Sequence, residues 1–308
     1  MNSETLITRR RPLVLPVTES PGVLIRRLWT LLARMDRRWL VKHLLLSVVG
    51  LLMVFPFVWM ISGALKSNAE IFASPLALIP QHLHWQTFVE TLHSAPFARY
   101  IVNSAWVALA TTLLVLANSA LFAYCMTQLQ FRGRTLCYLL VMASYMLPGA
   151  VTYIPAYIIL AKLQLLNSHS GLILSNAVSV FGVFYLRQVF SRIHPSLIEA
   201  ARIDGASEVK ILTAILLPQC KPALATLFLI TFITNYNSYM WPSLVLTDAD
   251  LSLIATGIRQ YFIAQGHYGL NWSHIMAACT LAVLPLLLLF VLCQHTILSS
   301  IAGNGVKE

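Results

Sequence analysis

The strongest constraint on this chain is a series of six long apolar stretches. They cover residues 44–65, 100–127, 136–161, 171–186, 223–246 and 274–298. A helix needs about 20 mostly apolar residues to cross the hydrocarbon core of a bilayer. Because lipid offers no partners to backbone polar groups, segments of this kind cross it as helices. We therefore predict an all-α polytopic membrane protein with six transmembrane helices.

The composition agrees with a membrane protein and gives no sign of a nucleic-acid or metal site. Hydrophobic residues make up 58% of the 308 residues and charged residues 10%, whereas soluble domains are about 45–50% apolar. The net charge of +10 comes without an aromatic-interleaved basic patch or a nucleic-acid motif. The five cysteines lack paired or metal-like spacing, so we expect reduced packing residues.

The basic residues are unevenly distributed between the connections. Of the 21 Lys and Arg residues, one side of the six predicted spans holds only Lys66, Arg99, Lys162 and Arg259. Basic residues accumulate in cytoplasmic loops of membrane proteins. We therefore expect both termini and the 187–222 loop to be cytoplasmic.

This topology divides the chain into three regions. A basic cytoplasmic tail covers residues 1–43, the six-span domain covers 44–298, and a cytoplasmic C-terminal tail covers 299–308. Within the first tail, Val23 to Leu40 either lies amphipathically on the membrane surface or is a positive anchor that fixes topology.

Three connections are expected on the outer side. The first, 66–99, contains a predicted short helix at 84–92, and the second, 162–170, reads as a simple turn. The third, 247–273, is long enough to dock an outer partner, but a lid or a plain connector explains it equally well.

The 187–222 loop contains a separate short helix with its own start and stop signals. Ser196 and Glu199 have the spacing of a capping box, Pro195 precedes them, and Gly205 can end the helix in a left-handed conformation. Helical spacing places Ala200 and Ala201 on one face that a partner could approach closely.

A second helix is predicted directly afterwards. Ser207 and Glu208 indicate its start, it continues to Leu217, and Pro218 is expected to bend it toward the fifth span. A plain connector between two spans would carry the same capping signals, so spacing alone leaves both interpretations open.

The order of residues in this loop resembles the EAA loop of bacterial ABC-importer permeases. Glu199-Ala200-Ala201 is followed after three residues by Gly205, and after nine more by Ile215, Leu217 and Pro218. Further segments resemble the carbohydrate-type, maltose-transporter-like branch of that family: Phe72-Ala73-Ser74-Pro75, Ile79-Pro80, Asn103-Ser104, Asn237-Ser238-Tyr239-Met240-Trp241-Pro242 and Val306-Lys307. The C-terminal residues 304–308 depart from the Gly-Ala-Val-Lys-Gly that is usual there.

The resemblance implies a role and a set of partners. The coupling element that would sit in a cleft of a cytoplasmic ATPase comprises Glu199, Ala200, Ala201, Asp204, Gly205 and Pro218. The Glu199 carboxylate would pair with a basic residue of that ATPase. The complex would contain a second homologous permease, two ATPase subunits and an extracytoplasmic solute-binding protein, assembled in the bacterial cytoplasmic (inner) membrane.

The sequence shows no ATP-binding motif that would supply an ATPase activity of its own. No G-x-x-x-x-G-K-[ST] phosphate loop occurs in it. ATP and Mg are therefore expected in the separate ATPase. We expect this chain to be no enzyme, with no catalytic residue and no bound cofactor or metal.

Polar side chains are concentrated in the fifth apolar stretch. We take Asn235, Asn237 and Tyr239 as candidates for the substrate pathway, in a group with Thr231, Thr234, Tyr236 and Ser238. Amides and tyrosines suit a neutral polyhydroxylated ligand, although the asparagines could instead join helices at a subunit interface. A weaker set, whose prolines are expected to produce kinks, comprises Asn118, Tyr145, Pro148, Tyr153 and Pro155.

We therefore expect import of a sugar, an oligosaccharide or a related polyol. The nearest alternative is a glycerol phosphate, which would favour Arg or Lys along the pathway. None is evident in the predicted spans, although a partner permease could supply one. An ion-coupled carrier would explain the hydropathy but not the Glu199 loop, and the middles of the spans hold no charged residue. A membrane enzyme would need a catalytic constellation, whereas His43, His194, His274 and His295 lie singly at span or helix boundaries.

Overall fold

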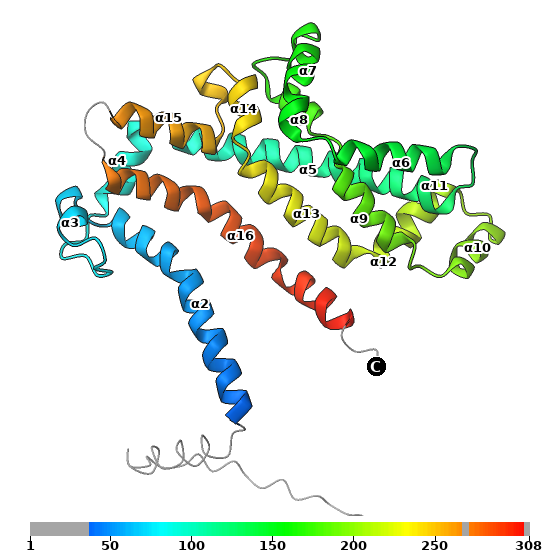
Figure 1. Ribbon diagram of the computed structural model, residues 1–308, viewed down its shortest axis with the longest axis horizontal. Coiled ribbons are helices and arrows are strands. Elements are labelled where there is room, and N and C mark those ends of the chain that lie inside the picture. Colours follow the sequence, from blue (N-terminus) through cyan, green and yellow to red (C-terminus); the bar gives the residue numbers. More distant parts are fainter. Residues whose placement is uncertain (1–36, 267–270, 305–308) are drawn as a thin grey trace, which may run out of the picture. The chain divides into compact units, whose positions relative to one another are not determined.

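Figure 1 shows the computed structural model, which describes residues 37–266 and 271–304. This part of the chain is helical and contains no strands. The predicted amphipathic segment Val23 to Leu40 lies almost wholly outside the described residues. The longer helices are α2 (Arg37–Ala64), α5 (Phe97–Gln128), α6 (Arg134–Tyr145), α7 (Gly149–Lys162), α9 (Val180–Phe190), α13 (Lys221–Tyr236), α15 (Ile254–Gly266) and α16 (Trp272–Asn304).

Shorter helices connect them. These are α3 (Asn68–Ala73), α4 (Gln86–Ser94), α8 (His169–Ser175), α10 (Pro195–Ile203), α11 (Glu208–Lys210), the π-helix η1 (Ile211–Leu216), α12 (Leu217–Gln219), α14 (Met240–Val245) and the 3-10 helix η2 (Ala249–Leu251). The chain divides into two compact units, residues 1–56 and 57–308. The described part of the first unit is the N-terminal portion of α2, and the sites below lie in the second.

Three helices are each long and apolar enough to cross a membrane. They are Val41–Ala64 within α2, the whole of α5, and Trp272–Gln294 within α16. They confirm the predicted helices at 44–65, 100–127 and 274–298. The last of them continues as α16 to Asn304, so the predicted C-terminal tail at 299–308 begins within a helix.

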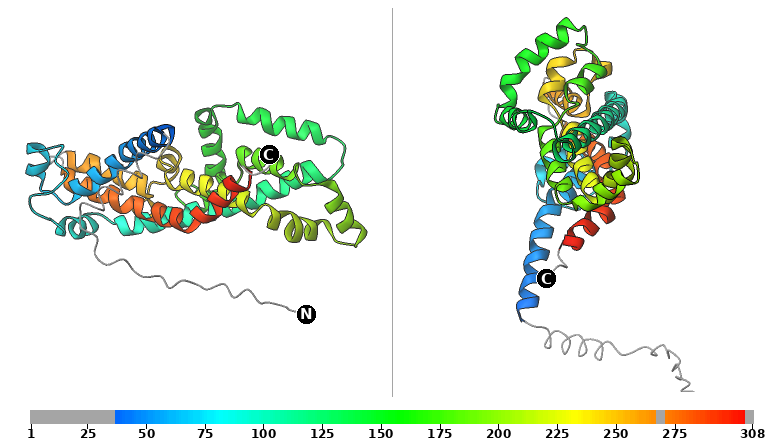
Figure 2. Two further views of the ribbon diagram at one scale, coloured as in Figure 1. Left: turned by 90° about the horizontal axis from the view of Figure 1, so that it is seen from below. Right: turned by 90° about the vertical axis from the view of Figure 1, so that its right-hand side faces the viewer.

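The remaining apolar segments are bent helix pairs instead of straight helices. α6 and α7 meet at 104°, and α8 and α9 at 47° (Figures 1 and 2). Pro148 at the first break confirms the predicted kink, because proline lacks an N–H. The residues from Glu208 to Gln219 meet α13 at 83°. If each pair is one broken span, the described chain has up to six spans.

The prediction of one continuous span at 223–246 was wrong in its last ten residues. α13 ends at Tyr236, Asn237 occupies its C-cap, and the separate helix α14 begins only at Met240. The sequence Asn-Tyr-Asn-Ser explains the break, because Asn and Ser favour caps and turns over helix interiors.

Helix α5 is the axis of the second unit. It packs along α13 and α9 and also contacts α15 and α8 (Figure 1). Its 32 residues correspond to a length of about 48 Å. One apolar cluster surrounds its Gln128 end and includes Tyr124, Phe190 and Ile198, and another surrounds its Phe97 end. Each cluster supports one polar region.

The outer connections contain more structure than the sequence predicted. The expected short helix at 84–92 is confirmed as α4. The 74–80 segment is bound by the end of α2: the Trp59 indole donates to the Pro75 carbonyl at 2.6 Å, and the buried Lys66 ammonium donates to the Ala77 carbonyl. The 247–273 connection contains α15, which the sequence analysis did not predict.

Candidate functional site

Helix α10 begins differently from the prediction. Its N-cap is His194, whose Nδ1 accepts from the Ser196 N–H at 3.4 Å, and Pro195 occupies the first turn. Ser196 therefore lies inside the helix, and its hydroxyl is 2.7 Å from the His194 Nδ1. The predicted capping box of Ser196 and Glu199 was wrong, because the His194 imidazole is the cap and accepts from the Ser196 N–H, to which the Glu199 carboxylate was expected to bond.

The end of α10 confirms the prediction for Gly205. This glycine has φ +77°, and the helix closes with two hydrogen bonds: Gly205 N–H to the Arg202 carbonyl at 3.0 Å, and Ala206 N–H to the Ala201 carbonyl at 3.0 Å. This pair of bonds is the Schellman arrangement, which favours glycine because a Cβ is costly at positive φ. Asp204 is the C-cap.

The two alanines of the motif lie on different faces of α10. Ala201 is 8% exposed and packs with Ile198 in the cluster at the Gln128 end of α5. Ala200 is exposed, as is Ile203 at 86%. The prediction that both alanines form one partner-facing surface was therefore wrong for Ala201, because Ile198 and Ala201 at i and i+3 are the anchoring side of the helix.

Glu199 is exposed and forms no hydrogen bond or ion pair with the described residues. It lines a hollow of about 350 Å³ whose wall includes Arg134, Arg187 and Arg202. Each arginine also has its own contact: Arg134 donates to the Leu129 carbonyl, Arg187 lies over the Tyr138 ring, and Arg202 binds Glu208. The Glu199 carboxylate is therefore available to another molecule.

Arg202 joins α10 to its surroundings. It donates to Glu208 Oε1 at 3.0 Å and Oε2 at 3.1 Å and to the Gln128 carbonyl at 3.1 Å. The Tyr124 hydroxyl donates to the same carboxylate. The guanidinium, and then the Tyr124 hydroxyl, hold the pKa of Glu208 below its usual range, because both favour the ionised form. We call Arg202, Glu208, Tyr124 and Gln128 the inner network.

The segment after α10 confirms its predicted start but not its predicted bend. Ser207 caps α11 by accepting from the Lys210 N–H at 3.4 Å. A π-helix follows, in which the Leu217 N–H bonds to the Leu212 carbonyl, five residues back. Pro218 has no backbone N–H to donate to the preceding helical turn. The wider hydrogen-bond spacing of the π-helix just before it is consistent with that missing donor. The 83° bend lies at Cys220, two residues after Pro218.

The predicted pathway residues separate into buried and exposed groups. The Asn235 amide donates to the Thr231 carbonyl of its own helix at 2.9 Å. Tyr236 is buried and its hydroxyl donates to the Ala282 carbonyl of α16 at 2.9 Å, so it joins two helices. Asn237 is exposed. Tyr239 is half-buried, with the Arg259 guanidinium 5.3 Å from its ring centre.

Of the weaker set, Asn118 and Tyr153 are used in packing, whereas Tyr145, Pro148 and Pro155 are exposed. The Asn118 amide donates to the Ala177 carbonyl at 3.0 Å, and the Tyr153 ring stacks on Trp241 at 5.4 Å. Trp241 in turn donates to the Ser175 hydroxyl at 2.9 Å. The two contacts of Trp241 hold α14 against α7 and α8.

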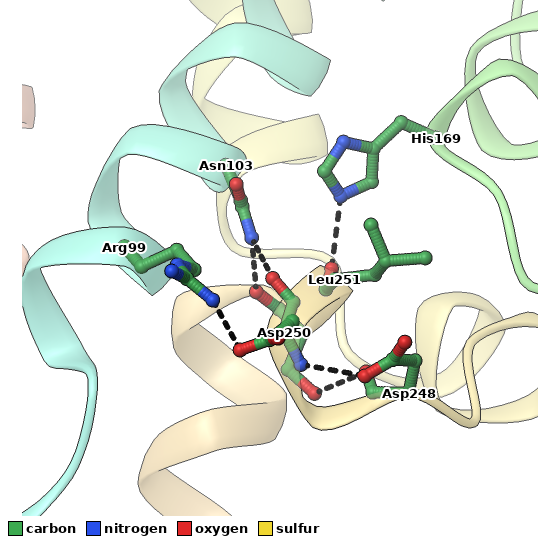
Figure 3. A network of polar contacts seen from close by, with 7 residues as sticks. Arg99, Asn103, His169, Asp248, Asp250 and Leu251 are labelled. Carbon is green, nitrogen blue, oxygen red and sulfur yellow. Dashed lines mark hydrogen bonds and ion pairs between the residues drawn. The ribbon is translucent and has the colours of Figure 1, made fainter.

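A second network, the outer network, lies at the Phe97 end of α5 (Figure 3). Arg99 pairs with Asp250, and the Asn103 amide donates to the carbonyls of Asp250 and Ser252 at 2.9 and 3.1 Å. The Asp248 carboxylate accepts from the Asp250 N–H at 2.9 Å. His169 lies 2.9 Å from the Leu251 carbonyl. The network fixes η2 and the start of α15.

Neither network is a metal centre. The described residues contain no group of three or more His, Cys, Asp or Glu side chains that could hold a metal ion. Each network has an exposed charged group beside it. These groups are the Glu199 carboxylate at one end of α5 and the Arg259 guanidinium at the other.

Comparison with known proteins gives a family and relatives. The family model described as "Binding-protein-dependent transport system inner membrane component" matches residues 119–300. Two similar relatives are sn-glycerol-3-phosphate transport system permease proteins UgpE. The one from Pectobacterium atrosepticum is 36% identical over 260 residues, covering 82% of this chain and 92% of its own. The one from Escherichia coli O1:K1 is 34% identical over 278 residues, covering 87% and 98%.

Two solved structures show the fold. A bacterial ABC transporter involved in the import of the acidic polysaccharide alginate matches with TM-score 0.74 and 21% identity, covering 91% of this chain and 99% of that one. The bacterial alginate ABC transporter in complex with alginate pentasaccharide-bound periplasmic protein matches with TM-score 0.61 and 20% identity, covering 87% and 96%.

Proposed function

The chain belongs to the family of binding-protein-dependent transport system inner membrane components, and we propose that it moves a small phosphorylated polyol such as glycerol 3-phosphate. It is a membrane-spanning permease subunit of an ABC importer. The support for this solute is the identity of 34–36% to glycerol-3-phosphate permeases over more than four-fifths of the chain. This solute is the alternative that the sequence analysis named beside a sugar, an oligosaccharide or a related polyol.

ATP hydrolysis in a separate subunit would be coupled to this chain through α10. The observation that carries this role is the exposed Glu199, which has no partner among the described residues and lies on a helix that is capped at both ends and anchored by Ile198, Ala201 and Arg202. A rigid helix with one free carboxylate suits a basic residue of an ATPase subunit. In this proposal ATP and Mg belong to that subunit, and Gly205 and Pro218 shape the exit of the chain from the coupling element.

The proposed topology has six spans with both termini and the 187–222 loop in the cytoplasm of a bacterial cell. It is supported by the three long helices and three bent pairs, and by the excess of basic residues in the connections on that side. Residues 44–298 would form the permease domain. A second homologous permease, two ATPase subunits and an external solute-binding protein would complete the complex, with Asn237 and Tyr239 facing the shared pathway.

The test is uptake by the complex purified through a tag on this chain. Proteoliposomes with ATP inside and the solute-binding protein outside should accumulate labelled glycerol 3-phosphate. Unlabelled phosphorylated polyols should compete, and neutral sugars should not. ATP-dependent uptake of a neutral sugar without uptake of glycerol 3-phosphate would overturn the proposed solute while leaving the importer role intact.

A further inference from the structure

Helix α15 brings a cation to the proposed pathway. In the sequence, Arg259 belongs only to an outer connection, and the predicted spans offered no cation for a phosphorylated solute. In the structure its guanidinium lies 5.3 Å from the ring centre of Tyr239, a predicted pathway residue. Arg259 is exposed, and Tyr239 lies between helices α13 and α14, two residues after the exposed Asn237.

One face of α15 is fixed, so the position of Arg259 is defined by the fold. Gly257 packs against the Tyr100 ring so closely that a Cβ there would lie 2.2 Å from it. The Ile254 N–H donates to the Ser104 hydroxyl at 2.8 Å. Ile254 and Gly257, at i and i+3, share the buried face. Arg259 projects from another face of the helix, which is exposed.

A further contact holds the second half of α15. The Tyr261 ring is buried and packs edge-on against Phe97, with ring centres 5.2 Å apart. The Ser94 hydroxyl lies 3.3 Å from the Tyr261 hydroxyl. A cation on a helix fixed both before and after it is suited to specific recognition, because its position need not be organised on binding.

The carboxylates in the connections on this side are already occupied. Glu70 accepts from the Gln81 N–H, Glu90 lies 3.2 Å from His274, Asp248 accepts from the Asp250 N–H, and Asp250 pairs with Arg99. Among the described residues Arg259 has the Tyr239 ring as its contact and no carboxylate. An external anion would therefore meet no competing carboxylate from the described residues.

We propose that Arg259, placed over the ring of Tyr239, binds the phosphate group of the solute in the pathway. This inference rests on the proposed function and assigns recognition of the negatively charged phosphate to one residue. A guanidinium presents N–H donors in its plane that match a phosphate bidentately, whereas the ring contact uses the face of the same group. Arg259 is a binding residue, and Tyr239 positions it.

The experiment compares Arg259→Gln and Arg259→Lys with Arg132→Gln, which removes the same charge from an exposed arginine in the connection between α5 and α6. Uptake of labelled glycerol 3-phosphate is measured in the reconstituted complex, with the amount of assembled complex as the folding check. We expect Arg259→Gln to lower uptake at limiting solute by about tenfold to hundredfold, the usual cost of losing a hydrogen bond to a charged group. Arg259→Lys should keep part of the uptake, and Arg132→Gln should match the unaltered protein.

A double-variant cycle tests the role of Tyr239. Tyr239→Leu alone should reduce uptake, and combined with Arg259→Gln it should add little, because both changes remove one arrangement. Equal uptake by Arg259→Gln and Arg132→Gln would overturn the inference while leaving the proposed solute standing. Absence of glycerol 3-phosphate uptake by the unaltered complex would overturn both. Fully additive losses would contradict the positioning role of Tyr239.

Discussion

The two ends of helix α5 are built alike but leave opposite charges free. In the inner network Arg202 binds Glu208, and the neighbouring Glu199 carboxylate has no partner among the described residues. In the outer network Arg99 binds Asp250, and Arg259 on the adjoining helix has no carboxylate there. In both cases the internal pairing fixes the backbone, and the group outside the pairing is available to another molecule.

The two regions are held by different means. The inner helix α10 packs through Ile198 and Ala201, and because it is short it depends as well on its caps and on the Arg202 contacts. The outer helix α15 depends on close packing, because Gly257 and Tyr261 are pressed against α5 and the residues before it. Substitutions should therefore damage the two ends through different mechanisms, and the following variants test that difference.

The largest effect is expected for Glu199→Lys. If α10 meets a basic residue of the ATPase, charge reversal places like charges together, and solute-stimulated ATP hydrolysis should fall by about a hundredfold, since such a juxtaposition costs several kcal/mol. The measurement is ATP hydrolysis by the reconstituted complex with the solute-loaded binding protein. Gln130→Lys is the matched control, because it adds a cation to the same hollow and keeps the carboxylate. Equal stimulation in both variants would contradict the role of Glu199.

Gly257→Ala should destabilise the outer end by about 2 kcal/mol, because the added methyl group overlaps the Tyr100 ring and forces a backbone shift. The check is the midpoint of thermal unfolding in detergent. Gly149→Ala is the control, since a Cβ there meets nothing within 4 Å. An unchanged midpoint for Gly257→Ala would show that packing does not hold α15.

Gly205→Ala should cost about 1 kcal/mol at the inner end, from the positive φ and not from a clash, since the space around it is open. Gly205→Asn should lose less, because asparagine tolerates the left-handed region better than alanine. Thermal unfolding and solute-stimulated ATP hydrolysis measure the two consequences. If asparagine and alanine were equivalent, the effect would not come from the backbone conformation.

The smallest effect is expected for Glu208→Gln, below about 1 kcal/mol, because the ion pair with Arg202 is partly exposed. The folded-state pKa of Glu208 is lowered, so its contribution is present above the usual carboxylate pKa and is lost as the pH falls through the lowered value. The stability difference between the unaltered protein and Glu208→Gln should therefore shrink below about pH 4. A difference that grows on acidification would contradict this assignment.

The sequence predicted those features whose causes are local. Long apolar runs specify α5 and α16, a glycine after a helical run specifies the left-handed turn at Gly205, and Ser207 caps the next helix as expected. Each depends on residues that are neighbours in the chain, so composition and spacing are sufficient.

The features that the sequence missed depend on tertiary contacts. Tyr124 and Glu208 are 84 residues apart, and no spacing rule joins them. Ala201 faces inward because it packs beside Ile198 in the same cluster, which the helical spacing of the two alanines could not indicate. Arg259 reaches Tyr239 only because α15 folds back along α5. The closest usable signal was the helical spacing of Ile254, Gly257 and Tyr261.

The most direct test of the two-ended account is chemical cross-linking from engineered cysteines at Ala200 and Thr247, which are exposed at the inner and outer ends. In a background without the five native cysteines, a thiol-directed photoactivatable reagent at Ala200→Cys should link this chain to the ATPase subunit, and at Thr247→Cys it should not. Cross-linking of the ATPase to Thr247→Cys, with none to Ala200→Cys, would contradict the account.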